Sequence, residues 1–329
     1  MISIVIPTYI NRMRSTDRLR LTLDSFIAQN MTHKSWELII VDDGSSVDVA
    51  DFVYNQVLNT PPFNVRVIRQ QHKGLCSAMN RGVSEAKNDV VLLGVDDNYA
   101  APNAVATLLN TYQKCSKTTR AVMGNERISL FTTGLHTLIK PEVFRGIDKK
   151  EYYKKYESEL QQFSDLTPNT LRTRFDELYA LSISENEFFE KCLLNNIHSN
   201  YSWLCFRPGA VVIGKKDYWA LNGFDEKFDP SGWYSDIDFG LKLYVAKGQL
   251  LYEKEAKFIH LNHLRYNATH KEDIRCFSYM VNKYGSFEVL LMPFLWEMKT
   301  FESYITAVEK VKEALKYTVD SGYQNYVSD

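Results

Sequence analysis

The first hundred residues alternate short apolar runs with segments whose apolar residues recur at helical spacing. The runs are rich in β-branched residues, as in strands covered on both faces, and occupy 2–7, 36–43, 63–70 and 89–95. The segments between them predict helices at 19–29, 49–58 and 75–87. Because strands that alternate with helices form parallel sheets, this half of the chain predicts an α/β fold, with a mainly parallel central sheet flanked by helices.

The pattern changes after this half. Residues 132–200 are charged and rich in tyrosine and phenylalanine, and they predict a helical insertion. Strand and helix signals return at 207–228, a helix opens within 232–248, and 250–263 reads as a strand that ends in two histidines. Apolar residues on one helical face within 285–317 predict a helical tail, and this face could pack internally or form a homodimer.

Polar clusters follow three of the predicted strands at their carboxyl ends. These clusters are Pro7-Thr8-Tyr9, Asp42-Asp43-Gly44-Ser45 and Asp96-Asp97-Asn98. Open α/β sheets bind ligands beyond the carboxyl ends of their strands. We therefore expect the three clusters to converge on one crevice.

Composition narrows the class of protein. The chain has 329 residues and a formal net charge of −1, so no global field favours nucleic acid. Its five cysteines are odd in number and lack a C-x-x-C pair, which is typical of reduced thiols in the cytoplasm. The apolar run 289–296 is too short to span a bilayer, and the first residues lack the features of a signal peptide. We expect a cytoplasmic protein, compatible with peripheral contact at the inner face of the membrane.

Charge gives the first indication of chemistry. Asp43, Asp97 and Asp236 lie at separate strand or loop ends, and His260 and His263 lie at the end of a further strand. Carboxylates gathered in one cleft repel one another unless they bind a cation. Oxygen ligands with a histidine suit Mn²⁺ or Mg²⁺, which in turn could stabilise the departing diphosphate of a nucleotide-sugar.

Five stretches taken in order resemble the motifs of family 2 glycosyltransferases with the GT-A fold. They are SIVIPTY, ELIIVDDGSS, HKGLCSAMNRG, VVLLGVDDN and NGFDEKFDPSGWYSDIDFGLKL, within 1–125 and 205–265. The resemblance implies a GT-A (Rossmann-like) domain over 1–265. This domain would comprise a nucleotide-binding half at 1–125, the insertion at about 132–200 and an acceptor-side half at 205–265, with a helical extension at 266–329.

The resemblance also implies an inverting transfer from a nucleotide-sugar, usually a UDP-sugar, with a divalent metal. On the donor side, Pro7, Thr8 and Tyr9 would line the nucleotide and Asp43 would hydrogen-bond the uracil. Met79 stands where the family often has an arginine facing the diphosphate, and the substitutes for it are Lys73, His72 or Arg81.

The metal-binding element of the family maps onto the acidic pair Asp96-Asp97, with Val95 in the position of its first acid. Asp97 would contact the metal, with Asp96 as the alternative. His260 matches a histidine that completes the metal site in many relatives, and His263 is the other candidate.

The general base of the family maps onto Asp236, which is preceded by Ser235 where relatives have glutamate. Trp233 and Tyr234, just before it, would line the acceptor pocket. The acceptor could be a glycan, a lipid-linked glycan, a peptide or a small molecule. Asp238 would cap the helix that follows.

Other hypotheses account for part of the pattern. Each acidic cluster alone could be only a turn or a helix cap. A nucleotide-sugar-binding module without catalysis would have no need of both Asp236 and His260. A nucleotidyltransferase depends on a glycine-rich phosphate loop near the N-terminus, whereas residues 7–18 contain no glycine.

Overall fold

The computed structural model covers the whole chain and forms two compact units. One comprises residues 1–139 and 158–273, and the other comprises 140–157 and 274–329. The structure describes residues 1–11, 16–31, 36–58, 64–115, 120–129, 143–144, 147–148, 154, 166–184, 186–261, 270–297 and 300–320.

A nine-stranded sheet forms the centre of the first unit, counted over the described residues. Its strands are β1 (Ile2–Thr8), β2 (Trp36–Asp42), β3 (Asn64–Arg69), β4 (Val90–Leu93), β5 (Asn98–Ala100), β6 (Arg120–Ile128), β9 (Ile183–Ser184), β10 (Val211–Gly214) and β11 (Gln249–His260). The order is β3-β2-β1-β4-β10-β6-β11-β5, and β9 pairs with β6. The pairs β2–β3, β1–β2, β1–β4 and β6–β11 are parallel, whereas β10, β5 and β9 run antiparallel to their partners. The predicted α/β sheet is confirmed; it is a mixed sheet, with the parallel pairings concentrated in the first half of the chain.

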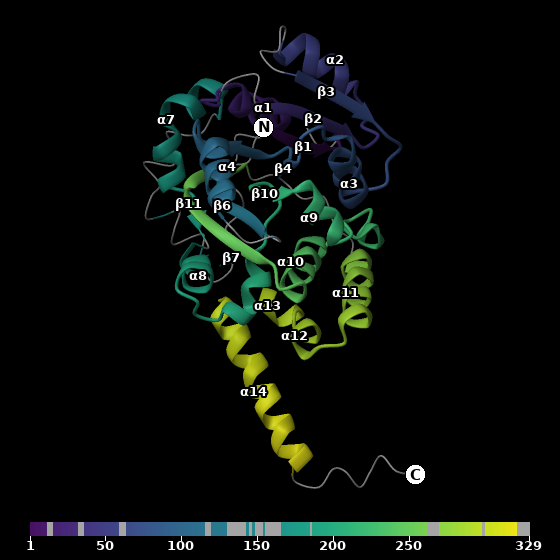
Figure 1. Ribbon diagram of the computed structural model, residues 1–329, viewed down its shortest axis with the longest axis vertical. Helices are drawn as coiled ribbons and strands as arrows, with labels where there is room; N and C mark the ends of the chain where they lie inside the picture. Colours follow the sequence, from purple (N-terminus) through teal and green to yellow (C-terminus); the bar gives the residue numbers. More distant parts are fainter. Residues whose placement is uncertain are drawn as a thin grey trace. The chain divides into compact units, whose positions relative to one another are not determined.

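Helices cover both faces of this sheet (Figure 1). The helices between residues 17 and 180 are α1 (Asp17–Ile27), α2 (Val49–Asp51), η2 (Phe52–Leu58), α3 (Leu75–Glu85), α4 (Ala104–Lys114) and α7 (Pro168–Ala180). Alternation along β1 sends Ile4 and Ile6 into a core shared with α1, η2 and α4. Val5 points to the opposite face, where α3 packs on β1 and β2. A Cβ at Gly82 of α3 would lie 2.2 Å from Val5 Cγ1, so only glycine allows this close approach.

The acceptor-side half is built from short helices around β10 and β11. They are α8 (Asn186–Phe189), η3 (Glu190–Leu194), η4 (Ser199–Cys205), α9 (Lys215–Ala220), η5 (Glu226–Phe228) and α10 (Ser235–Val245). The predicted strand at 250–263 is β11, which ends at His260; residues 262–269, with His263, lie outside the described part of the chain. The described part of the 132–200 segment is mainly helical and also contributes β9 to the sheet.

Sequence reasoning overlooked three elements in the middle of the fold. The strands β5 and β6 and the helix α4 were not anticipated, although β6 lies between β10 and β11 and is central to the sheet. The helix expected at 49–58 is present, but it winds as a π-helix from Phe52 onward.

The second unit is mainly helical. It contains the short pair β7 (Val143–Phe144) and β8 (Ile147–Asp148), most of α11 (His270–Tyr284), and the helices α12 (Phe287–Leu290), α13 (Pro293–Glu297) and α14 (Phe301–Asp320). The predicted helical tail is confirmed. The apolar stripe of α14 packs against α12 and α13, and Tyr304, Ile305 and Val308 are buried there.

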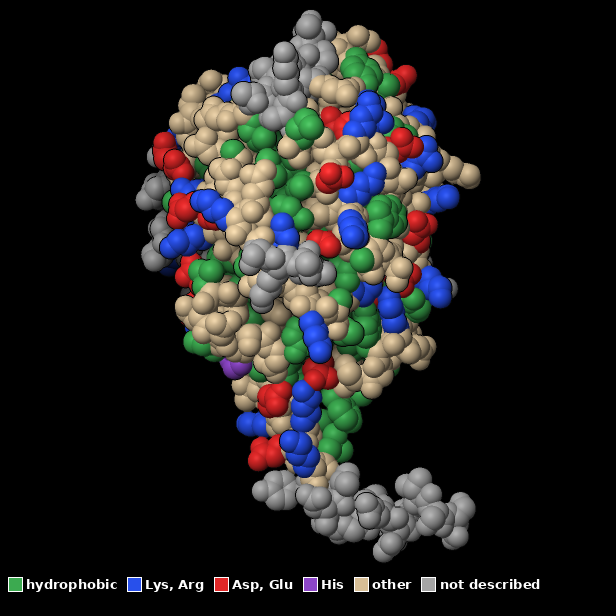
Figure 2. Space-filling view, viewed as in Figure 1, with side chains coloured by type: hydrophobic (Ala, Val, Ile, Leu, Met, Phe, Trp, Pro, Cys, Tyr) green, Lys and Arg blue, Asp and Glu red, His purple; other side chains and the backbone are tan. Residues whose placement is uncertain are grey.

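Two further properties concern the apolarity of the helices and the charges on the surface. No helix in the described part of the chain combines the length and apolarity needed to cross a membrane. On the face drawn in Figure 2, basic and acidic side chains are interspersed, as the near-zero net charge would suggest.

Candidate active site

The carboxyl ends of β1, β2 and β4 lie together and are joined by hydrogen bonds. The Thr8 hydroxyl donates to Asp96 Oδ2 at 2.6 Å, and the Asp43 amide donates to the Thr8 carbonyl at 2.9 Å. Pro7 is buried near the end of β1, where it pairs with Val41 of β2. The three polar clusters of the sequence therefore meet at one edge of the sheet.

Asp43 organises the loop that follows β3. The residue is 3% exposed, and its carboxylate accepts four hydrogen bonds. Gln70 Nε2 and the Lys73 amide donate to Oδ1 at 2.8 and 3.0 Å, and His72 Nδ1 and the Gly74 amide lie 2.7 and 2.9 Å from Oδ2. A carboxylate has about four acceptor positions, so this one is saturated by the protein itself.

The ring of His72 lies flat against Tyr9. The two ring centroids are 4.0 Å apart and the planes differ by 14°. The His72 side chain is 41% exposed, although it both stacks on Tyr9 and hydrogen-bonds Asp43. Next to it, Lys73 presents an exposed side chain whose ammonium has no ion pair with the described residues. Arg81, the third candidate cation, pairs with Glu85 at 2.9 Å.

A second acid, which is partly buried, helps to fix the same loop. The Asp229 carboxylate, from the acceptor-side half, accepts from the amides of Cys76 and Ser77 at 3.0 and 2.8 Å. It thereby caps the N-terminus of α3. Burial raises the pKa of Asp229, these two amides oppose the rise, and the charge of Asp43 adds to it. Asp229 was not anticipated, because nothing near it in sequence indicates a helix to cap.

Asp97 and His260 are brought together from opposite ends of the domain. His260 Nδ1 lies 3.4 Å from Asp97 Oδ1, because β5 pairs antiparallel with β11 and sets His260 opposite Asn98. The other oxygen of Asp97 lies 3.6 Å from Arg18 Nη1. Arg18 is a buried cation on α1 that sequence reasoning missed, and its only signal was an arginine beside the apolar stripe of that helix.

A carboxylate oxygen and an imidazole nitrogen at this separation fit one divalent cation. Ligand atoms bind such ions at about 2.0–2.2 Å, so two of them on one ion are at most roughly 4.4 Å apart. The described residues contain no group of three or more His, Cys, Asp or Glu side chains suited to a metal. Asp97 and His260 would therefore supply two ligands, and water or a diphosphate the others. Asp96 is the acid engaged by Thr8.

Glu126 adds an unanticipated carboxylate to this edge. Asn98 Nδ2 donates to Glu126 Oε2 at 2.7 Å. Burial raises the pKa of Glu126; the charge of Asp97 raises it further, whereas His260 and Arg207 lower it. The signal in the sequence was the polar run that ends the apolar strand β6.

Asp236, the predicted general base, lies in the first turn of α10. Its Oδ1 accepts from the Ile237 amide at 2.8 Å, and its Oδ2 lies 3.9 Å from Arg207 Nη1. One third of the side chain is exposed, 33%, so it can meet a substrate. The N-terminal end of a helix also stabilises negative charge at this position. Arg207, which sequence reasoning did not name, thus neighbours Glu126 electrostatically and Asp236 directly.

The neighbours of Asp236 differ in how much surface they offer. Trp233 is partly exposed, whereas Tyr234 is 4% exposed and adopts a left-handed φ of 64°. Such a conformation is uncommon for a non-glycine residue and often marks a constrained turn. Asp238 is fully buried and pairs with Lys242 at 3.2 Å. The expectation that Asp238 caps α10 is not met: Tyr234 is the N-cap residue and its side chain makes no capping hydrogen bond, whereas Asp238 lies within the first turn and pairs with Lys242.

Comparison with known proteins agrees with the motifs. The family model described as Glycosyl transferase family 2 matches residues 3–162. Validoxylamine A glucosyltransferase of Streptomyces hygroscopicus subsp. jinggangensis (strain 5008) is 23% identical over 313 residues, which are 94% of this chain and 66% of that protein. An uncharacterised glycosyltransferase of Bacillus subtilis (strain 168), YfnE, is 22% identical over 309 residues, covering 88% of this chain and 71% of that one.

The crystal structure of GalNAc-T7 with UDP, GalNAc and Mn²⁺ superposes with a TM-score of 0.56 at 15% identity, over 98% of this chain and 58% of that chain. At this identity the likeness shows the fold, which is GT-A. The fold and the acidic edge thus define the class: a GT-A protein whose polar residues gather at the carboxyl ends of its strands. Within that class, the chain carries a glycosyltransferase domain of family 2. It spans about two thirds of the length of the validoxylamine A glucosyltransferase it matches.

Proposed function

We propose that this protein transfers a sugar from a nucleotide-sugar to a hydroxyl group of an acceptor, with inversion at the anomeric carbon. The observation that supports this most is the pairing of Asp97 with His260 at 3.4 Å. Arg207 links this acidic edge to Asp236 in α10, because it acts on Glu126 and lies 3.9 Å from Asp236. An acidic metal site and a separate exposed carboxylate are what an inverting transfer requires: one for the leaving group and one for the nucleophile.

On the donor side, the nucleotide lies against the loops after β1 and β3. Tyr9 offers a ring face to the base, and Thr8 lies where β1 meets the acidic pair. Asp43 accepts an N–H from the base, and we take the donor to be a UDP-sugar for this reason. The exposed ammonium of Lys73 is the best placed of the three candidate cations to face the diphosphate, because Arg81 already pairs with Glu85.

Asp97 and His260 would hold a divalent cation such as Mn²⁺ or Mg²⁺. When bound, that ion supplies positive charge to the departing diphosphate. Arg18 lies 3.6 Å from Asp97 and limits the negative charge of the site. Glu126 is a further carboxylate at this edge, and Asn98 donates a hydrogen bond to it.

On the acceptor side, Asp236 takes the proton from the attacking hydroxyl. Its carboxylate is partly exposed, lies at a helix N-terminus and is steadied by the amide of Ile237. Arg207 Nη1 lies 3.9 Å from its Oδ2. Trp233 offers a partly exposed wall for a glycan, a lipid-linked glycan, a peptide or a small molecule, whereas little of Tyr234 is accessible.

A donor screen tests this proposal. The protein is incubated with UDP-glucose, UDP-N-acetylgalactosamine and GDP-mannose in Mn²⁺, with and without mixed glycan acceptors, and nucleotide release is measured. We expect release from a UDP-sugar that stops with EDTA, and a product whose anomeric configuration, read by NMR, is opposite to that of the donor. Binding of UDP without any turnover would favour the nucleotide-sugar-binding module. Retention of configuration would exclude Asp236 as the base of a single displacement.

A further inference from the structure

Tyr9 and Asp43 both contact a planar ring of the protein itself, the imidazole of His72. The imidazole of His72 lies on the Tyr9 ring at 4.0 Å and 14°, and its Nδ1 is 2.7 Å from Asp43 Oδ2. A nucleobase recognised by a ring face and a carboxylate would present the same two features: a planar surface and an edge N–H.

Asp43 has no hydrogen-bond acceptor position left for a nucleobase while His72 is bound to it. Its two oxygens accept from Gln70, His72, Lys73 and Gly74, so no position is left for a further donor. The amides of Lys73 and Gly74 are fixed in the backbone. Of the two side-chain donors, His72 is the one that also covers Tyr9, and its side chain is 41% exposed, which gives it room to turn toward solvent.

We propose that His72 fills the nucleobase slot formed by Tyr9 and Asp43, so that a nucleotide binds by displacing this ring. The inference rests on the proposed nucleotide-sugar activity and adds a step to it. Binding becomes an exchange in which the base takes over the stack on Tyr9 and the hydrogen bond to Asp43. The base replaces the ring stacked on Tyr9 and also the N–H that His72 donates to Asp43, so the buried carboxylate keeps its hydrogen bonds.

The exchange has a measurable consequence for affinity. When the competent arrangement is only a fraction of the population, the apparent affinity falls by that fraction. Removing the imidazole abolishes the competition, and we expect His72→Ala to bind UDP roughly three- to tenfold more tightly than the wild type. Ligands that carry no base do not enter the slot. Inorganic pyrophosphate with Mn²⁺ should therefore bind both proteins equally.

Calorimetric titration of the full chain with UDP and with pyrophosphate, both in Mn²⁺, tests the proposal. Gln70→Ala is the matched control, because it removes a donor from the same carboxylate at 2.8 Å without uncovering Tyr9, and it should not tighten UDP binding. Weaker UDP binding by His72→Ala with unchanged pyrophosphate binding would make His72 a wall for the base and overturn the proposal. Weaker binding of both ligands would make it a diphosphate contact, and equal UDP affinities would also overturn it.

A measurement on the wild-type protein covers the case in which the variant folds poorly. The proton signals of the His72 ring, assigned by their loss in His72→Gln, are followed by NMR as UDP is added. Stacking on Tyr9 shifts them, and displacement should return them toward the values of an exposed histidine. Signals that stay fixed at saturating UDP would refute the exchange. Failure of the proposed function is distinguishable, because it would appear as absent turnover in the donor screen whatever these binding results show.

Discussion

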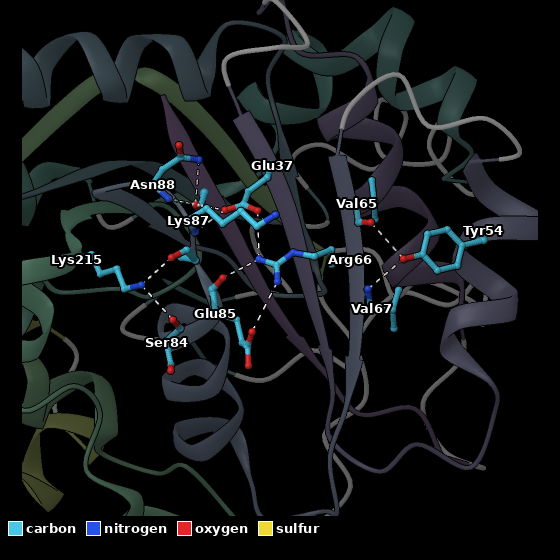
Figure 3. Close-up of polar contacts among 12 residues, drawn as sticks. Glu37, Tyr54, Val65, Arg66, Val67, Ser84, Glu85, Lys87, Asn88 and Lys215 are labelled. Carbon is cyan, nitrogen blue, oxygen red and sulfur yellow. Dashed lines mark hydrogen bonds and ion pairs between the residues drawn. The ribbon is translucent and has the colours of Figure 1, made fainter.

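The two ends of the parallel strands treat their charges differently. At the amino end, Glu37 of β2 is buried and well supplied with donors: the Ser3 hydroxyl and the Lys87 amide donate to Oε1, each at 2.7 Å, and Arg66 donates to Oε2 at 3.2 Å. Figure 3 shows Arg66 reaching from β3 toward Glu37 and Glu85. Burial tends to raise the pKa of Glu37, but Ser3, Lys87 and Arg66 together hold it below its ordinary value.

The same end also satisfies the last turn of α3. Lys215 donates to the carbonyls of Ser84 and Ala86 at 3.0 and 2.6 Å, and Asn88 donates to the Ser3 hydroxyl (Figure 3). Carbonyls at the end of a helix have no partner within it, and a cation placed there satisfies them. The hydrogen bonds of this network satisfy each of these polar groups, which indicates that they contribute to the stability of the fold.

At the carboxyl end, Asp43 is as fully hydrogen-bonded as Glu37, but the charged contacts of Asp97 and Asp236 are longer. Asp97 lies 3.4 Å from His260 and 3.6 Å from Arg18, and Asp236 lies 3.9 Å from Arg207. Glu126 has a raised pKa at this end, whereas Glu37 has a lowered one at the other. Acids whose surroundings do not fully stabilise them are candidates for function. For Glu37, Asp97 and Asp236, the completeness of the pairing thus distinguishes the acid proposed to serve stability from the two proposed to serve function.

The largest loss of activity is expected from substitution of Asp97. We expect Asp97→Ala to lose detectable sugar transfer and to weaken Mn²⁺ binding, measured by electron paramagnetic resonance of the free ion. Asp96→Asn is the matched control; it disturbs the hydrogen bond from Thr8 and should retain Mn²⁺ binding. If Asp96→Asn lost the ion and Asp97→Ala kept it, the ligand would be Asp96.

Asp236 should give the next largest effect. Removing a general base costs about 10²- to 10⁴-fold in rate and largely spares binding, so Asp236→Asn should lose that much kcat with donor affinity near the wild-type value. Steady-state kinetics and calorimetry of the donor measure the two quantities. Asp238→Asn is the control: this acid is buried against Lys242, so the change should lower thermal stability more than kcat. An inactive Asp238→Asn beside a fully active Asp236→Asn would reverse the assignment.

At the amino end, the expected loss is one of stability. Glu37→Gln removes the charge that Ser3 and Arg66 hold, and should lower the free energy of unfolding by about 1–3 kcal/mol without changing kcat. Urea denaturation measures this. Glu85→Gln is matched to it, because Glu85 contacts the same arginine at 3.7 Å from a more exposed position and should cost less than about 1 kcal/mol. Equal losses for the two variants would contradict the difference drawn between them.

The smallest expected effect is the pH dependence of the stability difference between the wild type and Glu37→Gln. The pKa of Glu37 is lowered in the folded chain, so its contribution to stability is full above the ordinary value of 4.5 and is lost as pH falls through the lowered value. The gap between wild type and Glu37→Gln should therefore narrow on acidification below about pH 4.5. Urea midpoints compared at neutral and acidic pH would show it. A gap that widens in acid would mean that Glu37 is not held in its charged form.

Part of this organisation could be read from the sequence because it depends on local rules. Apolar runs separated by helical segments predicted a parallel sheet, and parallel strands bring their carboxyl ends together. Thr8 and Asp96 could thus be expected as neighbours before the structure was known. Asp97 and His260 were anticipated from a family motif, and the antiparallel pairing of β5 with β11 gives the physical reason that they meet.

The rest depends on contacts that no local pattern encodes. Glu126 reaches the site because β6 lies between β10 and β11, an order set by the packing of distant segments. Arg18 contacts Asp97 only through the placement of α1 against β5. The saturation of Asp43 likewise required knowing that residues 70–74 fold back over it. In each case the residue type was visible and its partner was not.

The pairing of β5 with β11 also has a consequence for synthesis of the chain. Asp97 leaves the ribosome long before His260, and the strand that carries His260 is the last of the sheet to be made. Domains fold as they emerge, and pairings between distant segments are slow to form. A nascent chain that ends before β11 could assemble β1 to β4 and still lack His260, one of the two proposed cation ligands. Capture of the ion at this edge would then mark the completion of the domain, so that the growing polypeptide acquires its chemistry only when its last strand is in place.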